Sequence, residues 1–186
     1  GVIAGIFTDL AIGPFTTRLG NRKVLQGFLQ SVGLSGGKIA LALGAVDKVE
    51  KIGKEQVIKI LIEMGVEESS GRSLITLLTE VRSTDETMAL LKKLSLNPLF
   101  EEGVRELEKV VAGIRQFGVS ENYFCVDISI ARGLDYYTGT VYETRLDAYP
   151  ELGSIASGGR YEDLASSLTN RKLPGVGISI GVTRLL

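Results

Sequence analysis

The spacing of apolar residues changes twice along this chain, and these changes constrain the fold more than any other feature. Residues 14–20 alternate like a β-strand and lead into one helical pattern, whereas residues 38–118 carry an unbroken series of helical patterns. Beyond residue 118 the alternation of period two returns. Strand and helix do not alternate regularly, which argues against a doubly wound parallel sheet. The sequence therefore predicts an α+β fold, in which an antiparallel sheet with flanking helices is interrupted by an all-α insertion.

These changes divide the chain into three parts. Residues 1–44 and 118–186 are predicted to form the first and second parts of one sheet domain, and residues 45–117 form the helical insertion between them. At 186 residues the chain has the length of one ordinary domain with a smaller insertion. The helices of the insertion are expected to break at Gly53, Gly65, Gly71, Ser83 and Pro98.

Local signals place the elements of the sheet domain. Asn21 is expected to cap a helix that ends at Gly33. A second helix is expected to begin near Tyr161, and a third at Gly181. The expected strands cover residues 14–20, 124–130, 140–146, 154–157 and 176–180.

The ends of the chain and its single cysteine limit which cellular compartment the protein is expected to occupy. The first dozen residues are apolar but contain Asp9 and are far too short to span a bilayer, so we expect a strand or helix end and no membrane partner. A chain that begins at Gly1 and stops at Leu186 inside an apolar helical start is expected to be a piece of something longer. Cys125 cannot form an internal disulfide, which fits a reducing, cytoplasmic location, and we expect it to be a small buried hydrophobe.

The composition removes several classes of chemistry. Histidine is absent, which excludes histidine bases, histidine metal sites and nucleophiles activated by histidine. The 21 basic and 22 acidic residues give a formal net charge of -1, so no global field attracts nucleic acid. Residues 47–115 carry 11 basic and 13 acidic residues, which is typical of solvated amphipathic helices. The remaining chemistry uses arginine, carboxylates and tyrosine, and phosphoryl or nucleotidyl transfer is compatible with it.

Residues 132–139 have the composition of an active site. They combine a permanent cation with two phenols and two glycines in the order Arg-Gly-Leu-Asp-Tyr-Tyr-Thr-Gly. The fork of Arg132 suits a phosphate or carboxylate, and the hydroxyls of Tyr136 and Tyr137 are directional. In a regular strand these two tyrosines would point to opposite faces, so one could pack while the other lines a pocket. A salt bridge within a turn is the alternative for Arg132.

Two glycine-rich segments follow. In residues 157–161, Ser-Gly-Gly-Arg-Tyr, the pair Gly158 and Gly159 is expected to lead from a strand into a helix and to let a ligand approach, with Tyr161 at the mouth of the turn. A tight turn without a ligand is the alternative. Residues 175–184 contain glycines that do not match the dinucleotide fingerprint, and alone they specify no function.

The three segments together resemble histidyl-tRNA synthetase, a class II aminoacyl-tRNA synthetase. Residues 132–139 resemble the histidine-specific signature, residues 157–161 a segment of the histidine pocket, and residues 175–184 motif 3. Residues 15–25 resemble the family segment before its insertion domain, so the resemblance covers nearly the whole chain. It implies a class II antiparallel sheet and a histidine–tRNA ligase that uses ATP with Mg²⁺ to form histidyl-adenylate and then charges tRNA(His).

The resemblance also implies roles for individual residues. Arg132 would be catalytic, stabilising the α-phosphate of ATP and the histidine carboxylate. The histidine site would be lined by Tyr136, Tyr137, Gly158, Gly159 and Tyr161, with Tyr161 near the imidazole. Gly181 and Arg184 would hold ATP. No residue is expected to bind metal, because the nearby carboxylates lack ligand spacing.

Parts of the family pattern have no counterpart in these residues. Nothing resembles class II motif 1, motif 2 or the anticodon-binding domain. We therefore expect a homodimer for the full-length parent and little or no aminoacylation by this piece alone, whose own oligomeric state the sequence does not reveal.

Two other functions remain open. A non-catalytic paralogue that senses histidine, like the regulatory subunit of ATP phosphoribosyltransferase, would need no arginine for a transition state, so the complete signature with Arg132 favours the ligase. A helical interaction module with a vestigial sheet would not be stabilised by histidine.

Overall fold

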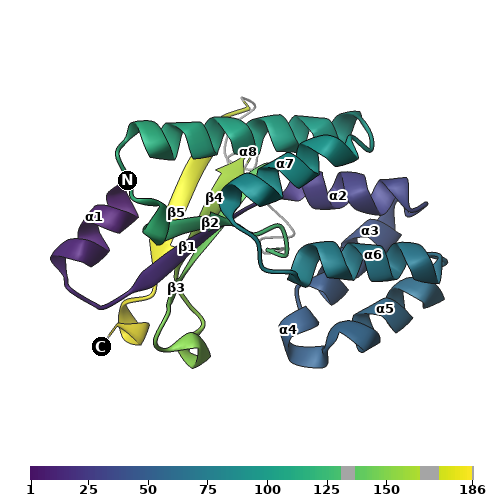
Figure 1. Ribbon diagram of the computed structural model, residues 1–186, viewed down its shortest axis with the longest axis horizontal. Helices are drawn as coiled ribbons and strands as arrows, with labels where there is room; N and C mark the ends of the chain where they lie inside the picture. Colours follow the sequence, from purple (N-terminus) through teal and green to yellow (C-terminus); the bar gives the residue numbers. More distant parts are fainter. Residues whose placement is uncertain (131–136, 164–171, 186) are drawn as a thin grey trace.

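The computed structural model describes residues 1–130, 137–163 and 172–185, and they form one mixed sheet with helices around it (Figure 1). The strand order is β2-β1-β3-β4-β5. The strands are β1 Phe15–Asn21, β2 Phe124–Val126, β3 Thr140–Leu146, β4 Ser154–Tyr161 and β5 Gly175–Ile180. The α-helices in the described ranges are α1 Val2–Asp9, α2 Arg22–Ser31, α3 Gly37–Val46, α4 Val49–Ile52, α5 Lys54–Glu63, α6 Glu68–Thr79, α7 Thr84–Leu94 and α8 Pro98–Gln116. Short 3-10 helices are η1 Glu121–Tyr123, η2 Pro150–Leu152 and η3 Val182–Arg184.

The sheet is antiparallel except at one edge. β3 pairs antiparallel with β1 and β4, and β4 pairs antiparallel with β5. β2 runs parallel to β1, with Thr17 opposite Phe124. A parallel pair needs a long crossover connection, and the helices between β1 and β2 supply it. The α+β prediction is confirmed, with this parallel edge added to the expected antiparallel sheet.

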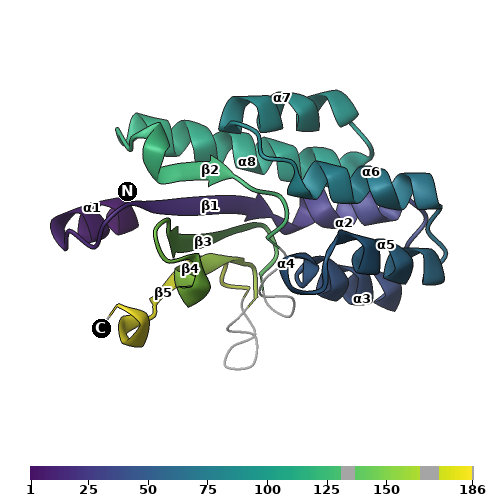
Figure 2. The same cartoon turned by 60° about the horizontal axis from the view of Figure 1, so that its bottom comes forward.

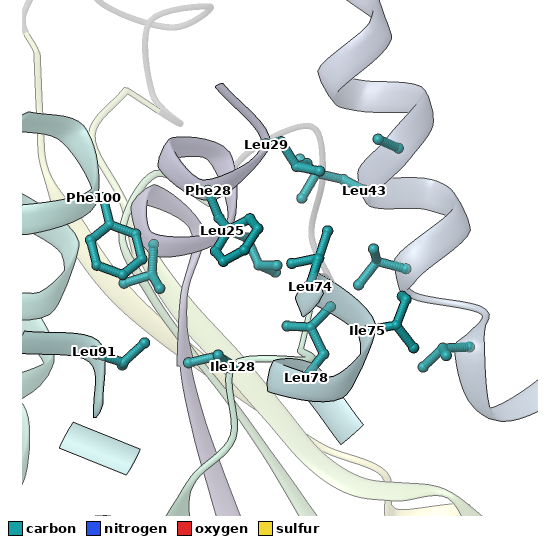
Figure 3. Packing of buried hydrophobic residues seen from close by; sticks show 14 of the residues in the cluster. Leu25, Phe28, Leu29, Leu43, Leu74, Ile75, Leu78, Leu91, Phe100 and Ile128 are labelled. Carbon is teal, nitrogen blue, oxygen red and sulfur yellow. The ribbon is translucent and has the colours of Figure 1, made fainter. Parts of the chain in front are cut away.

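One hydrophobic core joins the sheet to the helices. It includes Leu19 of β1 and Val126 of β2 together with buried residues of α2, α3, α5, α6, α7 and α8. Figure 3 shows Leu25 of α2 and Leu74 of α6 within this cluster. Figure 2 shows α8 running beside α2, against which it packs. Because the core is shared, the three-part division of the chain at residues 44 and 117 stays a prediction.

A second core lies under α1. Phe7 of α1 meets Phe15 of β1 edge to face, with ring centroids 5.5 Å apart, and Phe15 stacks on Tyr123 at 4.8 Å. Such pairs of aromatic rings add about 0.5–1.5 kcal/mol beyond the burial of their surface. The start of the chain, expected to be a strand or a helix end, is therefore a helix fixed on one side of the sheet.

Most predicted helix boundaries are confirmed. Asn21 caps α2, its side chain accepting from the Lys23 backbone N–H at 2.9 Å. Helix α2 ends two residues before Gly33, which has a φ of 90°. Ser83 caps α7 and forms a reciprocal capping box with Glu86. No helix in the described part of the chain is both long enough and apolar enough to cross a membrane.

The predictions for Gly71 and for residues 124–130 are wrong. Gly71 lies inside α6 rather than between helices, because an isolated glycine is tolerated in a helix and Leu74 and Ile75 bury the face of this one. The strand expected over residues 124–130 ends at Val126, because the Asp127 carboxylate accepts from the backbone N–H of Ser129 at 2.9 Å and forms a turn. Apolar alternation beyond Val126 marks buried positions, not a strand.

Candidate functional site

The two faces of the sheet differ in chemistry. Residues that are paired across neighbouring strands share a face, and successive residues alternate between faces. Leu19 and Tyr142 lie on the face that packs into the main core. The opposite face carries small and polar residues, and we call it the polar face. Its two central rows are Gly20, Val141, Gly159 and Gly177, and Arg18, Glu143, Ser157 and Ser179.

The glycine pair Gly158 and Gly159 lies within β4, which corrects the predicted strand-to-helix turn. β4 continues to Tyr161 because both glycines pair in register with β3 and β5. A Cβ on Gly158 would lie 2.7 Å from the Tyr142 ring, and one on Gly159 would lie 2.8 Å from the Tyr137 ring. Each glycine therefore makes room for one tyrosine, on opposite faces of the sheet. Tyr137 rests on the polar face.

Tyr142 was missed by sequence reasoning. Its hydroxyl donates to the carbonyl oxygen of Gly177 at 2.5 Å on the core-facing side, and burial raises the pKa of this phenol. This hydrogen bond ties β3 to β5 across the glycines of β4. The sequence did contain a signal for this residue, because Tyr142 follows Tyr137 by five residues and alternation places it on the face opposite to Val141 and Glu143.

Tyr161 is the last residue of β4 and lies over Gly175 of β5. A Cβ on Gly175 would lie 2.6 Å from the Tyr161 hydroxyl. The pairing of these two residues places Tyr161 on the same face as Gly159 and Tyr137. The backbone N–H of Thr138 donates to the Arg160 carbonyl at 2.9 Å, which holds the two tyrosines at the same end of the sheet. The helix expected near Tyr161 does not begin there, because Tyr161 still belongs to β4, and the rest of that prediction falls on residues 164–171, outside the described residues.

The end of the signature is fixed by α2 and α8. Arg132 and Tyr136 lie outside the described residues, whereas the Gly139 carbonyl accepts from the Arg22 backbone N–H at 3.0 Å. A Cβ on Gly139 would lie 3.0 Å from Oε2 of Glu106, a residue of α8.

Glu106 is itself held in place by Lys23 of α2 and by Asn21, the residue that caps α2. It accepts from the Asn21 side chain at 2.7 Å and from the Lys23 ammonium at 2.5 Å. Burial alone would lower the pKa of Lys23, but the carboxylates of Glu102 and Glu106 outweigh it and raise the pKa. Lys23 therefore stays charged beside the end of the signature.

Gly181 and Arg184 lie beyond the other end of β5. Gly181 donates its N–H to the Ile155 carbonyl at 2.8 Å and precedes η3, so the expected helix is a short 3-10 turn. The Arg184 guanidinium donates to the Ser154 carbonyl. From Gly175 to Gly181 the strand advances six residues, which corresponds to roughly 20 Å. The polar face thus brings Tyr137, Gly159 and Tyr161 together and places Arg184 at its far end.

A charged network lies partly on this face, and sequence reasoning missed it. It consists of Arg18, Glu50, Asp127, Glu143 and Arg145. Glu143 is only 2% exposed, and Arg145 Nε donates to its Oε1 at 2.5 Å. The alternation of residues 140–146 contained the signal, because it places Glu143 and Arg145 on one side of a strand.

A cavity of about 350 Å³ adjoins the network between β2 and the helices. Arg18, Glu50 and Asp127 line it together with the half-buried Cys125. Burial, with a smaller effect from Asp127, raises the pKa of the Cys125 thiol to about 11. The thiol is therefore neutral near pH 7, and it does not serve as a nucleophile there.

Comparison with known proteins identifies the family. The family model for histidyl-tRNA synthetase matches residues 3–185. A histidine–tRNA ligase from Nostoc punctiforme is 50% identical over all of this chain, which covers 40% of that relative. The crystal structure of histidyl-tRNA synthetase from Nostoc sp. PCC 7120 superposes with a TM-score of 0.94 and 45% identity, over 99% of this chain and 44% of that one.

A more distant structure shares the fold. It is described as an ATP phosphoribosyltransferase regulatory subunit/histidyl-tRNA synthetase from Bacillus halodurans and has a TM-score of 0.81 at 20% identity, over 99% of this chain and 47% of that one. This chain spans less than half the length of each of these proteins. With the family model matched over residues 3–185, the chain belongs to the histidyl-tRNA synthetase family.

Proposed function

We propose that the protein containing this chain is a histidine–tRNA ligase, which activates histidine with ATP and transfers it to tRNA(His). The observation that carries the proposal is the placement of Tyr137 and Tyr161 on one polar face, each against a glycine that leaves room for its ring. The 50% identity to a histidine–tRNA ligase supports the same function. The activity would belong to the longer protein, because this chain spans about 40% of that relative.

The residues of the polar face suit the binding of histidine. Tyr137, with Tyr136 beside it in the sequence, would line the histidine site over the floor formed by Gly158 and Gly159. The Tyr161 hydroxyl would meet the imidazole, because it can donate or accept a hydrogen bond. These groups orient the amino acid without a titrating base.

The arginines would stabilise negative charge in the activation step. The histidine carboxylate attacks the α-phosphorus of ATP in line, the bond to the β-phosphate oxygen breaks, and pyrophosphate leaves. Arg132 would bind the histidine carboxylate and the α-phosphate as charge develops there. Arg184, which follows Gly181 at the far end of β5, would hold the nucleotide. Catalysis would come from positioning and charge neutralisation.

Mg²⁺ is expected as the companion of ATP. Within residues 1–130, 137–163 and 172–185, no three cysteine, aspartate or glutamate side chains gather as a metal site. Because Mg²⁺ is usually held by substrate phosphates and water with only one or two carboxylates, we propose that the ion enters bound to the ATP phosphates.

The remaining properties concern the longer protein. We propose that it acts in the cytoplasm as a homodimer and that the isolated chain aminoacylates little or not at all, since it has no segment resembling motif 1 or motif 2. Histidylation of tRNA by the isolated chain would contradict this.

The regulatory paralogue is the second candidate. Its support is weaker, because this chain is only 20% identical to the Bacillus halodurans protein and that similarity extends to the fold alone. The presence of Arg132 in a complete signature also favours the ligase, because a sensor has no transition state to stabilise.

Histidine-dependent exchange of pyrophosphate into ATP by the full-length protein tests the proposal. The wild type should exchange with histidine and not with other amino acids, and Arg132→Ala should lose most of this activity. Specific histidine binding without exchange would reject the ligase in favour of the regulatory paralogue.

A further inference from the structure

Glu50 connects the helices to the polar face of the sheet. It lies in α4, and its Oε2 accepts from Nη1 of Arg145 on β3 at 2.9 Å. Its Oε1 accepts from Nη1 of Arg18 on β1 at 3.4 Å. Burial alone would raise the pKa of Glu50, but hydrogen bonds and charge from the two arginines outweigh it and lower the pKa. An ionised carboxylate therefore bridges two neighbouring strands from outside the sheet.

One branch from Glu50 leads toward the signature. Arg18 also donates to Oδ2 of Asp127 at 3.2 Å. The other oxygen of Asp127 accepts from the Ser129 backbone N–H at 2.9 Å and from the Ser129 hydroxyl at 2.6 Å. These bonds fix the turn after β2, and Ser129 lies three residues before Arg132 in the sequence. Arg18 thus contacts the turn that precedes the signature in the sequence.

The second branch leads to the floor of the polar face. Arg145 bridges Glu50 and Glu143, donating to Glu143 through Nε at 2.5 Å. Glu143 is nearly inaccessible, and a buried carboxylate without a cationic partner is strongly unfavourable. Val141, the partner of Gly159, lies two residues before Glu143 on β3. Glu143 is therefore about 7 Å along the strand from the position opposite Gly159.

We propose that Glu50 is a positioning residue for histidine activation, acting through Arg18 on the turn before the signature and through Arg145 on Glu143. This inference rests on the proposed ligase function. The Glu50 side chain is 57% exposed, and exposed ion pairs contribute little to stability. Its removal should therefore change the rate of activation more than the folding of the protein.

The experiment compares Glu50→Ala and Glu50→Gln with Glu55→Ala in the full-length protein. Glu55 is a matched control, because it is a similarly exposed glutamate that pairs with Arg72 of α6, a helix of the same segment. A small misplacement of reacting groups lowers rates severely, so we expect Glu50→Ala to lower kcat for histidine-dependent pyrophosphate exchange about tenfold. KM values for histidine and ATP should stay close to the wild type. Glu50→Gln, which keeps an acceptor but no charge, should be intermediate, and Glu55→Ala should match the wild type.

The outcomes separate the two proposals. Equal kcat for Glu50→Ala and Glu55→Ala would overturn the role of Glu50 while leaving the ligase intact. A melting temperature lowered in both Glu50 variants, with the loss of kcat following the loss of folded protein, would make Glu50 structural and also overturn the role. Absence of exchange by the wild type would reject the ligase function and the role of Glu50 with it.

Discussion

Tyr137 packs so closely against Gly159 that a Cβ on this glycine would lie 2.8 Å from Cδ1 of the ring. The same Cβ would lie 2.9 Å from the Thr140 carbonyl oxygen, which is backbone and cannot rotate away. Gly159→Ala should therefore displace Tyr137 and destabilise the sheet by about 1–3 kcal/mol, the usual cost of overpacking. Thermal unfolding and the KM for histidine in the full-length protein measure the two effects.

Gly113→Ala is the control for this substitution. Gly113 lies within α8, and a Cβ added there would meet no atom of another described element within 4 Å. Alanine in a helix interior stabilises by about 0.5–1 kcal/mol relative to glycine. The two variants should thus shift the melting temperature in opposite directions. A Gly159→Ala protein as stable as the wild type, with an unchanged KM, would contradict the packing argument.

Tyr161→Phe tests the hydroxyl that lies over Gly175. The ring remains, so we expect no more than a small change in melting temperature and a higher KM for histidine. Gly175→Ala should act in the same direction by pushing the ring, because its Cβ would lie 2.6 Å from the hydroxyl. Steady-state pyrophosphate exchange measures both variants, and unchanged KM values would remove Tyr161 from the histidine site.

Sequence reasoning succeeded where a local pattern determines the structure. Asn21 was recognisable as a helix cap and Ser83 as a break between helices, because their side chains satisfy the first backbone N–H groups of a helix. The strand at residues 140–146 was recognisable from its β-prone sequence, and the structure has it with the same bounds.

Contacts between distant residues could not be predicted in the same way. The glycine pair at residues 158–159 looked like a turn because its reason lies in Tyr137 and Tyr142, which approach from opposite faces. The network around Glu50 depends on the docking of α4 on the sheet, and no local pattern encodes that docking. The roles of Arg132 and Tyr136 stay predictions, because both lie outside the described residues.

Ser83→Ala tests the capping box of α7. The Ser83 hydroxyl accepts from the Glu86 backbone N–H at 3.2 Å, and the Glu86 carboxylate accepts from the Ser83 backbone N–H at 2.8 Å. Losing this cap should destabilise the protein by about 1 kcal/mol. Ser69→Ala is the control, because that exposed hydroxyl donates to Glu67 and caps no helix. Equal melting temperatures for the two variants would contradict the capping role.

Cys125 should react slowly with iodoacetamide. Burial raises the pKa of its thiol from 9.0 to about 11, so at pH 8 the folded protein should contain about a hundredfold less thiolate than the unfolded chain. Because folding raises the pKa of this thiol, Cys125 makes its full contribution to the free energy of unfolding below pH 9. The contribution is lost as the pH rises toward 11. Alkylation at pH 8 with and without urea, followed by mass spectrometry, measures the low reactivity of the folded thiol. Cys125→Ser should flatten the pH dependence of the melting temperature between pH 9 and 11. Equal alkylation rates in the folded and unfolded protein would contradict the raised pKa.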